Sequence, residues 1–135
     1  MKKIILHSEN NYVLRPLTGK IFIDDVFFDY IQLKVDKELV LPKQSKKLYI
    51  KADWLTSNVV ELNEDNLTLK IYSKVQNSFF VYSCVCVFLS VIWSFLQNYI
   101  YFNTYISMAL LMPMLIIVGK QVFQRKEFII IERIG

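Results

Sequence analysis

The sequence predicts an α+β membrane protein, in which a small antiparallel β-sandwich is followed by a two-helix transmembrane hairpin. Apolar and polar residues alternate through the first half of the chain, which is the period of strands with one buried face. Residues 75–119 then contain no charged residue at all. This stretch is too long for one membrane span of about 20 residues and has the length of a pair.

The charge pattern divides the 135-residue chain into three parts. We expect a cytoplasmic β-sandwich domain at residues 1–74, a transmembrane hairpin at 75–122 and a cytoplasmic tail at 123–135. The apolar run of residues 4–6 is too short for a secretory signal peptide. Basic residues precede the first span and follow the second, but the connecting loop has none. The positive-inside rule therefore predicts a cytoplasmic (bacterial inner) membrane protein with both termini in the cytoplasm.

Within residues 1–74, four of the expected strands show alternating apolar and polar residues, which predicts one buried face for each. Residues 3–6 and 12–15 are expected to form an N-terminal hairpin, and residues 39–41 either a strand buried on both sides or an edge strand. Turn residues such as Asp, Asn and Pro separate the runs. Several short strands at this spacing are typical of a small sandwich or barrel. The apolar positions that define the remaining strands are Ile21 and Ile23; Ile31, Leu33 and Val35; Leu48, Ile50 and Ala52; and Leu67, Leu69 and Ile71.

Three motifs in residues 18–73 resemble the small bacterial β-sandwich modules of the PEGA type. These motifs are the run from Gly19 to Ile23-Asp24-Asp25, the run Leu39-Val40-Leu41-Pro42, and the run from Leu48 through Asp53-Trp54 to Ser57-Asn58. The sequence departs from the pattern at Asp25, where the turn glycine is usual, and at residues 43–45, where glycine-histidine is usual. The resemblance implies a non-catalytic β-sandwich, often joined to membrane helices, and names no ligand.

Four aromatic residues are candidates for binding a partner. We expect Trp54 to close the sandwich as a structural residue, whereas the alternative is a partner-binding patch around it. Tyr30, Tyr49 and Tyr72 alternate with core positions and should point outward, like Phe22, among lysines. Aromatics interleaved with lysines can bind single-stranded nucleic acid or rest on anionic lipid headgroups, but a solvated sheet face accounts for them as well. Since the net charge of +4 is modest, we expect no nucleic acid partner.

The two spans should run from about residue 75 or 78 to 96 and from about 101 or 104 to 119. Ser83, Cys86, Ser90 and Ser94 recur along one side of the first helix, and small residues at this spacing let helices approach closely. This face packs either on the second helix or on another copy of the chain. Pro113 should kink the second helix. An interfacial aromatic belt is expected at the loop end, from Trp93, Tyr99, Tyr101 and Tyr105.

The tail and the missing motifs complete the prediction. Residues 128–131 are apolar and too short to span, so they either pair with the β-domain or lie at the lipid interface. One histidine, three glycines and no metal-ligand cluster argue against catalysis, and no cofactor is expected. We expect a non-enzymatic membrane protein whose β-module binds a protein partner, as an immunity or accessory protein would. The alternative is a small subunit of a larger membrane complex or oligomeric channel.

Overall fold

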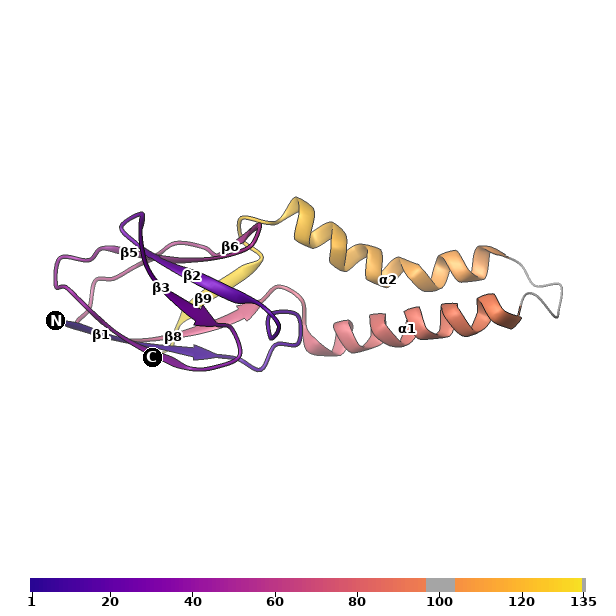
Figure 1. Cartoon of the computed structure of the whole chain (residues 1–135), viewed down its shortest axis with the longest axis horizontal. Coiled ribbons are helices and arrows are strands. Elements are labelled where there is room, and N and C mark those ends of the chain that lie inside the picture. Colours follow the sequence, from indigo (N-terminus) through magenta and orange to yellow (C-terminus); the bar gives the residue numbers. More distant parts are fainter. Residues whose placement is uncertain (97–103, 135) are drawn as a thin grey trace. The chain divides into compact units, whose positions relative to one another are not determined.

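The computed structural model describes residues 1–96 and 104–134 and divides the chain into two compact units (Figure 1). The β unit comprises residues Met1–Lys74 together with Gln124–Gly135, and the helical unit comprises Val75–Phe123. The C-terminal tail therefore belongs to the β unit. The chain leaves this unit after the eighth strand and returns to it for the ninth.

One layer of the β unit is a four-stranded sheet in the order β4-β1-β8-β9. Its strands are β1 (Lys2–Ser8), β4 (Lys37–Leu41), β8 (Asn66–Ser73) and β9 (Ile129–Arg133). β1 pairs antiparallel with β4 and β8 pairs antiparallel with β9, but β1 and β8 are parallel. The prediction of a purely antiparallel sandwich is therefore wrong at the centre of this sheet. The chain builds the whole second sheet between these two strands and re-enters in the same direction.

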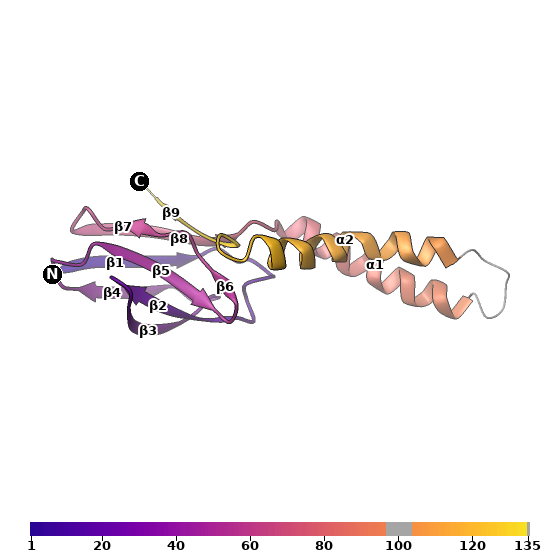
Figure 2. The same ribbon diagram turned by 90° about the horizontal axis from the view of Figure 1, so that it is seen from above.

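The second sheet has five strands and lies against the first. β3 (Val26–Gln32), β2 (Thr18–Ile23), β5 (Lys47–Ala52) and β6 (Leu55–Thr56) follow in that order, and β7 (Val60–Glu61) also pairs with β5. Figure 2 shows the strands from a second direction. The core between the sheets is formed by alternate apolar residues of both layers, including Ile4, Leu6, Leu69 and Ile71 from one sheet and Ile21, Leu48 and Ile50 from the other.

Two local expectations differ from the structure. Residues 12–15 form a turn rather than the second strand of a hairpin. The buried Asn11 side chain directs this turn, because its Oδ1 accepts the backbone N–H groups of Val13 at 3.1 Å and Leu14 at 3.3 Å. The strand expected around residues 31–35 ends at Gln32, and Val35 is 52% exposed.

The tail closes one side of the core. Phe128 is the largest fully buried side chain of the described residues, and Ile129 and Ile131 of β9 are also buried. The backbone N–H of Lys74 donates to the carbonyl of Phe128 at 3.2 Å. The Asn58 side chain binds Ile131 twice, donating from Nδ2 to its carbonyl at 2.9 Å and accepting its N–H at 2.7 Å. The Asn58 amide thereby acts as a one-residue continuation of the sheet at the edge of β9.

The helical unit consists of α1 (Asn77–Leu96) and α2 (Thr104–Phe123), which pack against each other (Figure 1). Ser83, Cys86 and Ser90 are the buried residues of α1, and their spacing of three and four is that of a coiled-coil seam. Half-buried Leu110 and Met114 and buried Ile117 repeat this spacing on α2. Small residues on α1 and larger ones on α2 thus form the two sides of the seam.

Three other expectations concern the ends and middle of these helices. Ser94 is exposed, so the seam ends before it. Pro113 lies inside α2, which continues through it to Phe123. Tyr105 is 76% exposed, whereas Tyr99 and Tyr101 of the expected aromatic belt lie outside the described residues.

Candidate partner-binding face

An aromatic cluster covers the outer face of the five-stranded sheet. The rings of Phe22 on β2 and Tyr49 on β5 stack across the strands with their centroids 5.2 Å apart and their planes 3° from parallel. Phe27 on β3 meets Phe22 edge-on at 6.1 Å and Tyr30 at 5.0 Å. Tyr30 is 54% exposed and Phe27 is 45% exposed. Two of the predicted partner-binding residues, Tyr30 and Tyr49, therefore belong to one continuous surface.

Two lysines lie beside this cluster. Lys20 and Lys51 are directly opposite each other on β2 and β5. The Lys51 ammonium lies 5.1 Å from the ring centroid of Phe22 and 5.6 Å from that of Tyr49, which is the geometry of a cation–π interaction. Next to it is a groove of about 230 Å³. Its lining residues are Thr18, Lys20, Phe22, Lys51 and Asp53.

Tight turns bring acidic residues to the margin of the same face. Asp24 and Asp25 join β2 to β3 with φ angles of 48° and 67°, so aspartate here adopts the left-handed conformation that glycine usually supplies. Asp24 is held by the backbone N–H of Lys47, which donates to its Oδ1 at 2.9 Å. Partial burial and then a hydrogen bond to the Asp25 carboxylate raise the pKa of Tyr49 above its ordinary value.

Trp54 is not a core residue, which corrects the expectation that it closes the sandwich. Its side chain is 64% exposed, because Asp53 and Trp54 form the two-residue turn between β5 and β6. Asp53 has a φ angle of 50°, as such hairpins require. Trp54 follows directly after Asp53, which lines the groove. The structural role expected of this motif falls instead to Ser57, whose Oγ accepts the N–H of Ile50 at 2.8 Å.

Tyr72 does not join the other candidates. It lies on β8 in the four-stranded sheet, where its hydroxyl donates to Glu132 of β9 at 3.0 Å. This hydrogen bond, followed by partial burial, raises the pKa of Tyr72. Phe27, by contrast, was not a predicted site residue. A bulge between Ile21 and Phe22 shifts the register of β3 and brings Phe27 onto the aromatic face, and no sequence pattern indicates that bulge.

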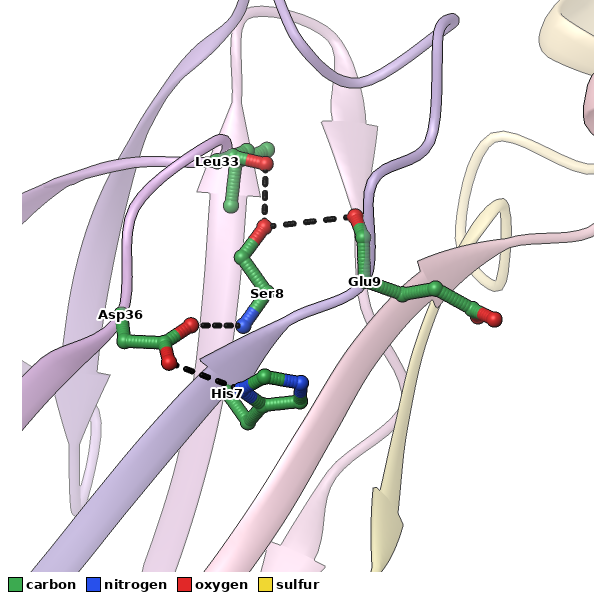
Figure 3. A network of polar contacts seen from close by, with 5 residues as sticks. All are labelled: His7, Ser8, Glu9, Leu33 and Asp36. Atoms are coloured by element: carbon green, nitrogen blue, oxygen red, sulfur yellow. Dashed lines mark hydrogen bonds and ion pairs between the residues drawn. The ribbon is translucent and has the colours of Figure 1, made fainter.

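His7, Ser8 and Asp36 come together at the end of β1 (Figure 3). Asp36 binds His7 Nδ1 at 2.8 Å and accepts the backbone N–H of Ser8 at 2.8 Å, and these two interactions lower the pKa of Asp36. The Ser8 hydroxyl donates to the carbonyl of Leu33 at 2.5 Å and makes no bond to the imidazole. His7 and Ser8 are neighbours in β1, so their side chains point to opposite sides of the strand and do not form a nucleophile–base pair. Together with Asp36 they link β1 to the β3–β4 connection.

Two further observations bear on function. Within residues 1–96 and 104–134, no three His, Cys, Asp or Glu side chains are grouped closely enough to hold a metal ion. Comparisons with protein-family models, curated proteins and solved structures find no match.

Proposed function

We propose that this chain is a membrane-anchored binding module. In this proposal α1 and α2 cross the cytoplasmic membrane as a hairpin, and the β unit lies in the cytoplasm with both termini. Its aromatic–lysine face, defined as Lys20, Phe22, Tyr30, Tyr49 and Lys51 with the adjoining Phe27, binds a protein partner. The chain acts by holding that partner at the membrane, as an immunity or accessory protein does, and performs no catalysis of its own.

The observation that carries the anchor is the unburied apolar surface of the two helices. Both are long and apolar enough to cross a membrane, yet only 17% of the apolar stretch of α1 and 6% of that of α2 is buried within the chain. Large side chains face outward all along them, including Phe88, Phe95, Met108 and Leu115 at 59–68% exposure. Soluble monomers rarely expose apolar patches larger than a few hundred Å². Lipid is the natural solvent for such a surface.

The polar groups of α1 are compatible with this solvent. The hydroxyls of Ser83, Ser90 and Ser94 donate to carbonyls within their own helix at 2.7–2.9 Å. Each of these three hydroxyls is thereby satisfied without water, which the hydrocarbon region of a bilayer requires. Such back-bonded serines allow close helix packing without leaving a donor unpaired in lipid.

The basic residues that border the helical unit support the orientation. Lys74 precedes α1, and Lys120 lies in the last turn of α2, where its ammonium is 6.0 Å from the Phe79 ring centroid. Arg125 and Lys126 follow α2. By the positive-inside rule these residues hold both helix ends on the cytoplasmic side.

The anchor is tested by washing membranes that contain the full chain with alkaline carbonate. We expect the wild-type chain to stay in the pellet. The double variant Leu89→Lys and Leu115→Lys carries a charge in each helix, at a cost of about 2.5–3.5 kcal/mol per charge near a span centre, and should be lost from the membrane. Val59→Lys, which changes a 55% exposed apolar residue of the β unit, is the matched control and should be retained. Release of the wild-type chain by carbonate would refute the anchor.

A further inference from the structure

The outer face of the five-stranded sheet holds two like charges in an unfavourable arrangement. Lys20 and Lys51 are direct cross-strand neighbours, and side chains in such positions have their Cβ atoms about 4.5–5.5 Å apart. Like charges placed directly opposite destabilise a sheet. Within residues 1–96 and 104–134, no carboxylate lies within 4.0 Å of either ammonium group. The sheet therefore keeps two uncompensated cations side by side.

The outer face of the four-stranded sheet is different. Its lysines are neutralised by neighbouring carboxylates, with Lys3 3.0 Å from Glu38 and Lys70 3.2 Å from Glu9. The same chain thus compensates cations on one face and leaves them open on the other. The open pair also borders a groove and an aromatic cluster. An anionic group placed between Lys20 and Lys51 would supply the missing compensation.

The surroundings decide which kind of anion fits. Asp53 lines the groove together with the two lysines, and Glu61 lies opposite Lys47 on the same sheet. A flat anionic bilayer would meet these carboxylates as well as the lysines and would be repelled by them. A peptide can place a carboxylate on the lysines and present a backbone N–H to Asp53. It can also rest apolar side chains on the Phe22 and Tyr49 rings.

The edge of the five-stranded sheet that β3 forms is blocked as a docking site. Lys37 at the start of β4 reaches across to β3, where its ammonium binds Asp29 Oδ2 at 2.6 Å and also the carbonyl of Tyr30. The β3 bulge further interrupts the regular row of backbone groups, and both devices are known to discourage strand addition. A ligand is therefore directed onto the face of the sheet.

We propose that the groove binds an extended acidic segment of a partner protein, with one carboxylate held between the ammonium groups of Lys20 and Lys51. This inference rests on the proposed function and specifies the chemistry of the partner. The stacked rings of Phe22 and Tyr49 fix the position of Lys51 through its cation–π contacts. Lys51 is therefore held in place before the carboxylate arrives, which lowers the entropy lost on binding.

The test uses the full chain in a neutral, non-ionic detergent and a fluorescent decapeptide of alternating glutamate and valine. We expect this probe to bind more tightly than the matched glutamine–valine peptide and to weaken as salt is raised. The double variant Lys20→Gln and Lys51→Gln should lose about tenfold in affinity, since two charge-assisted hydrogen bonds are removed. The control variant Lys3→Gln and Lys70→Gln alters the ion-paired face and should bind like the wild type.

A second variant separates loss of binding from loss of folding. Lys20→Glu creates an opposite-charge pair with Lys51, so its unfolding midpoint should equal or exceed that of the wild type, while glutamate-peptide binding is lost. Equal binding of the two peptides, or equal weakening in both double variants, would overturn the inference. It would also be overturned if phosphatidylglycerol added as mixed micelles, but not phosphatidylcholine added in the same way, displaced the probe while the glutamate peptide had no advantage. Because the assay is done in detergent, these results are independent of whether α1 and α2 span a membrane.

Discussion

Replacing Phe128 with alanine tests whether the C-terminal tail is an integral part of the β unit. The side chain is fully buried, and a Phe→Ala change at such a site costs about 3–5 kcal/mol through lost burial and the cavity left behind. A small domain has only about 5–15 kcal/mol of stability in total. With a urea dependence of about 1–3 kcal/mol per molar, the unfolding midpoint should fall by about 2 M.

The assay follows hydrogen exchange of β8 and β9 amides by mass spectrometry, with the full chain in detergent and urea increasing. Phe123→Ala is the matched control, because Phe123 lies five residues earlier and is 88% exposed. It should change stability by no more than about 0.5 kcal/mol. The reasoning is refuted if the two variants unfold at the same urea concentration. Fast exchange of wild-type β9 beside a protected β8 would refute it too.

Three further outcomes are expected. Trp54→Ala should leave the free energy of unfolding within about 0.5 kcal/mol of the wild type, because the ring is mostly exposed. Degradation of this variant in membranes would instead indicate that Trp54 packs in the core. The pKa of Asp36 is lowered from its ordinary 3.8, first by the Ser8 amide and then by His7, so its stabilising effect is present above about pH 4 and is lost as the pH falls through the folded value. The stability gap between wild type and Asp36→Asn should therefore close as the pH falls below about 4, and a gap that is constant with pH would contradict this. Ser83→Leu should weaken the helix pair by about 1–3 kcal/mol in a dodecyl sulfate titration, whereas the exposed Ser94→Leu should not, and equal effects would place the seam elsewhere.

Much of the architecture can be predicted from the sequence, because single physical patterns dominate it. The uncharged stretch is far longer than a buried core helix needs. α1 lies within it, and α2 begins within it and ends four residues beyond it, at Phe123. Period-two alternation marks the buried residues of β2, β5 and β8, since one face of each strand lies on the core. In α1 the spacing of small residues predicts the side that packs against another helix, and Ser83, Cys86 and Ser90 are its buried residues.

Features that depend on long-range pairing are not visible in the sequence. The parallel pairing of β1 with β8 joins residues more than sixty positions apart, and no local signal records it. Trp54 was expected inside because large aromatic side chains favour burial, but a two-residue hairpin turn leaves it no position in the core. The bulge that brings Phe27 beside Phe22 is likewise a product of sheet pairing. The aromatic–lysine face is therefore only partly predictable from the sequence. Alternation places Tyr30, Tyr49 and the neighbouring lysines on the surface, but it does not predict Phe27.

The membrane topology of the chain tests the central claim most directly. A reporter that is active only in the cytoplasm is fused after Gly135 in one chain, and a reporter that is active only after export is inserted at Asn98 in another. The proposed hairpin predicts that both reporters are active, because the chain would cross the membrane twice between the β unit and its tail. An exported C-terminal reporter, or a cytoplasmic one at Asn98, would contradict the hairpin. It would then be necessary to find another explanation for the apolar surface of α1 and α2.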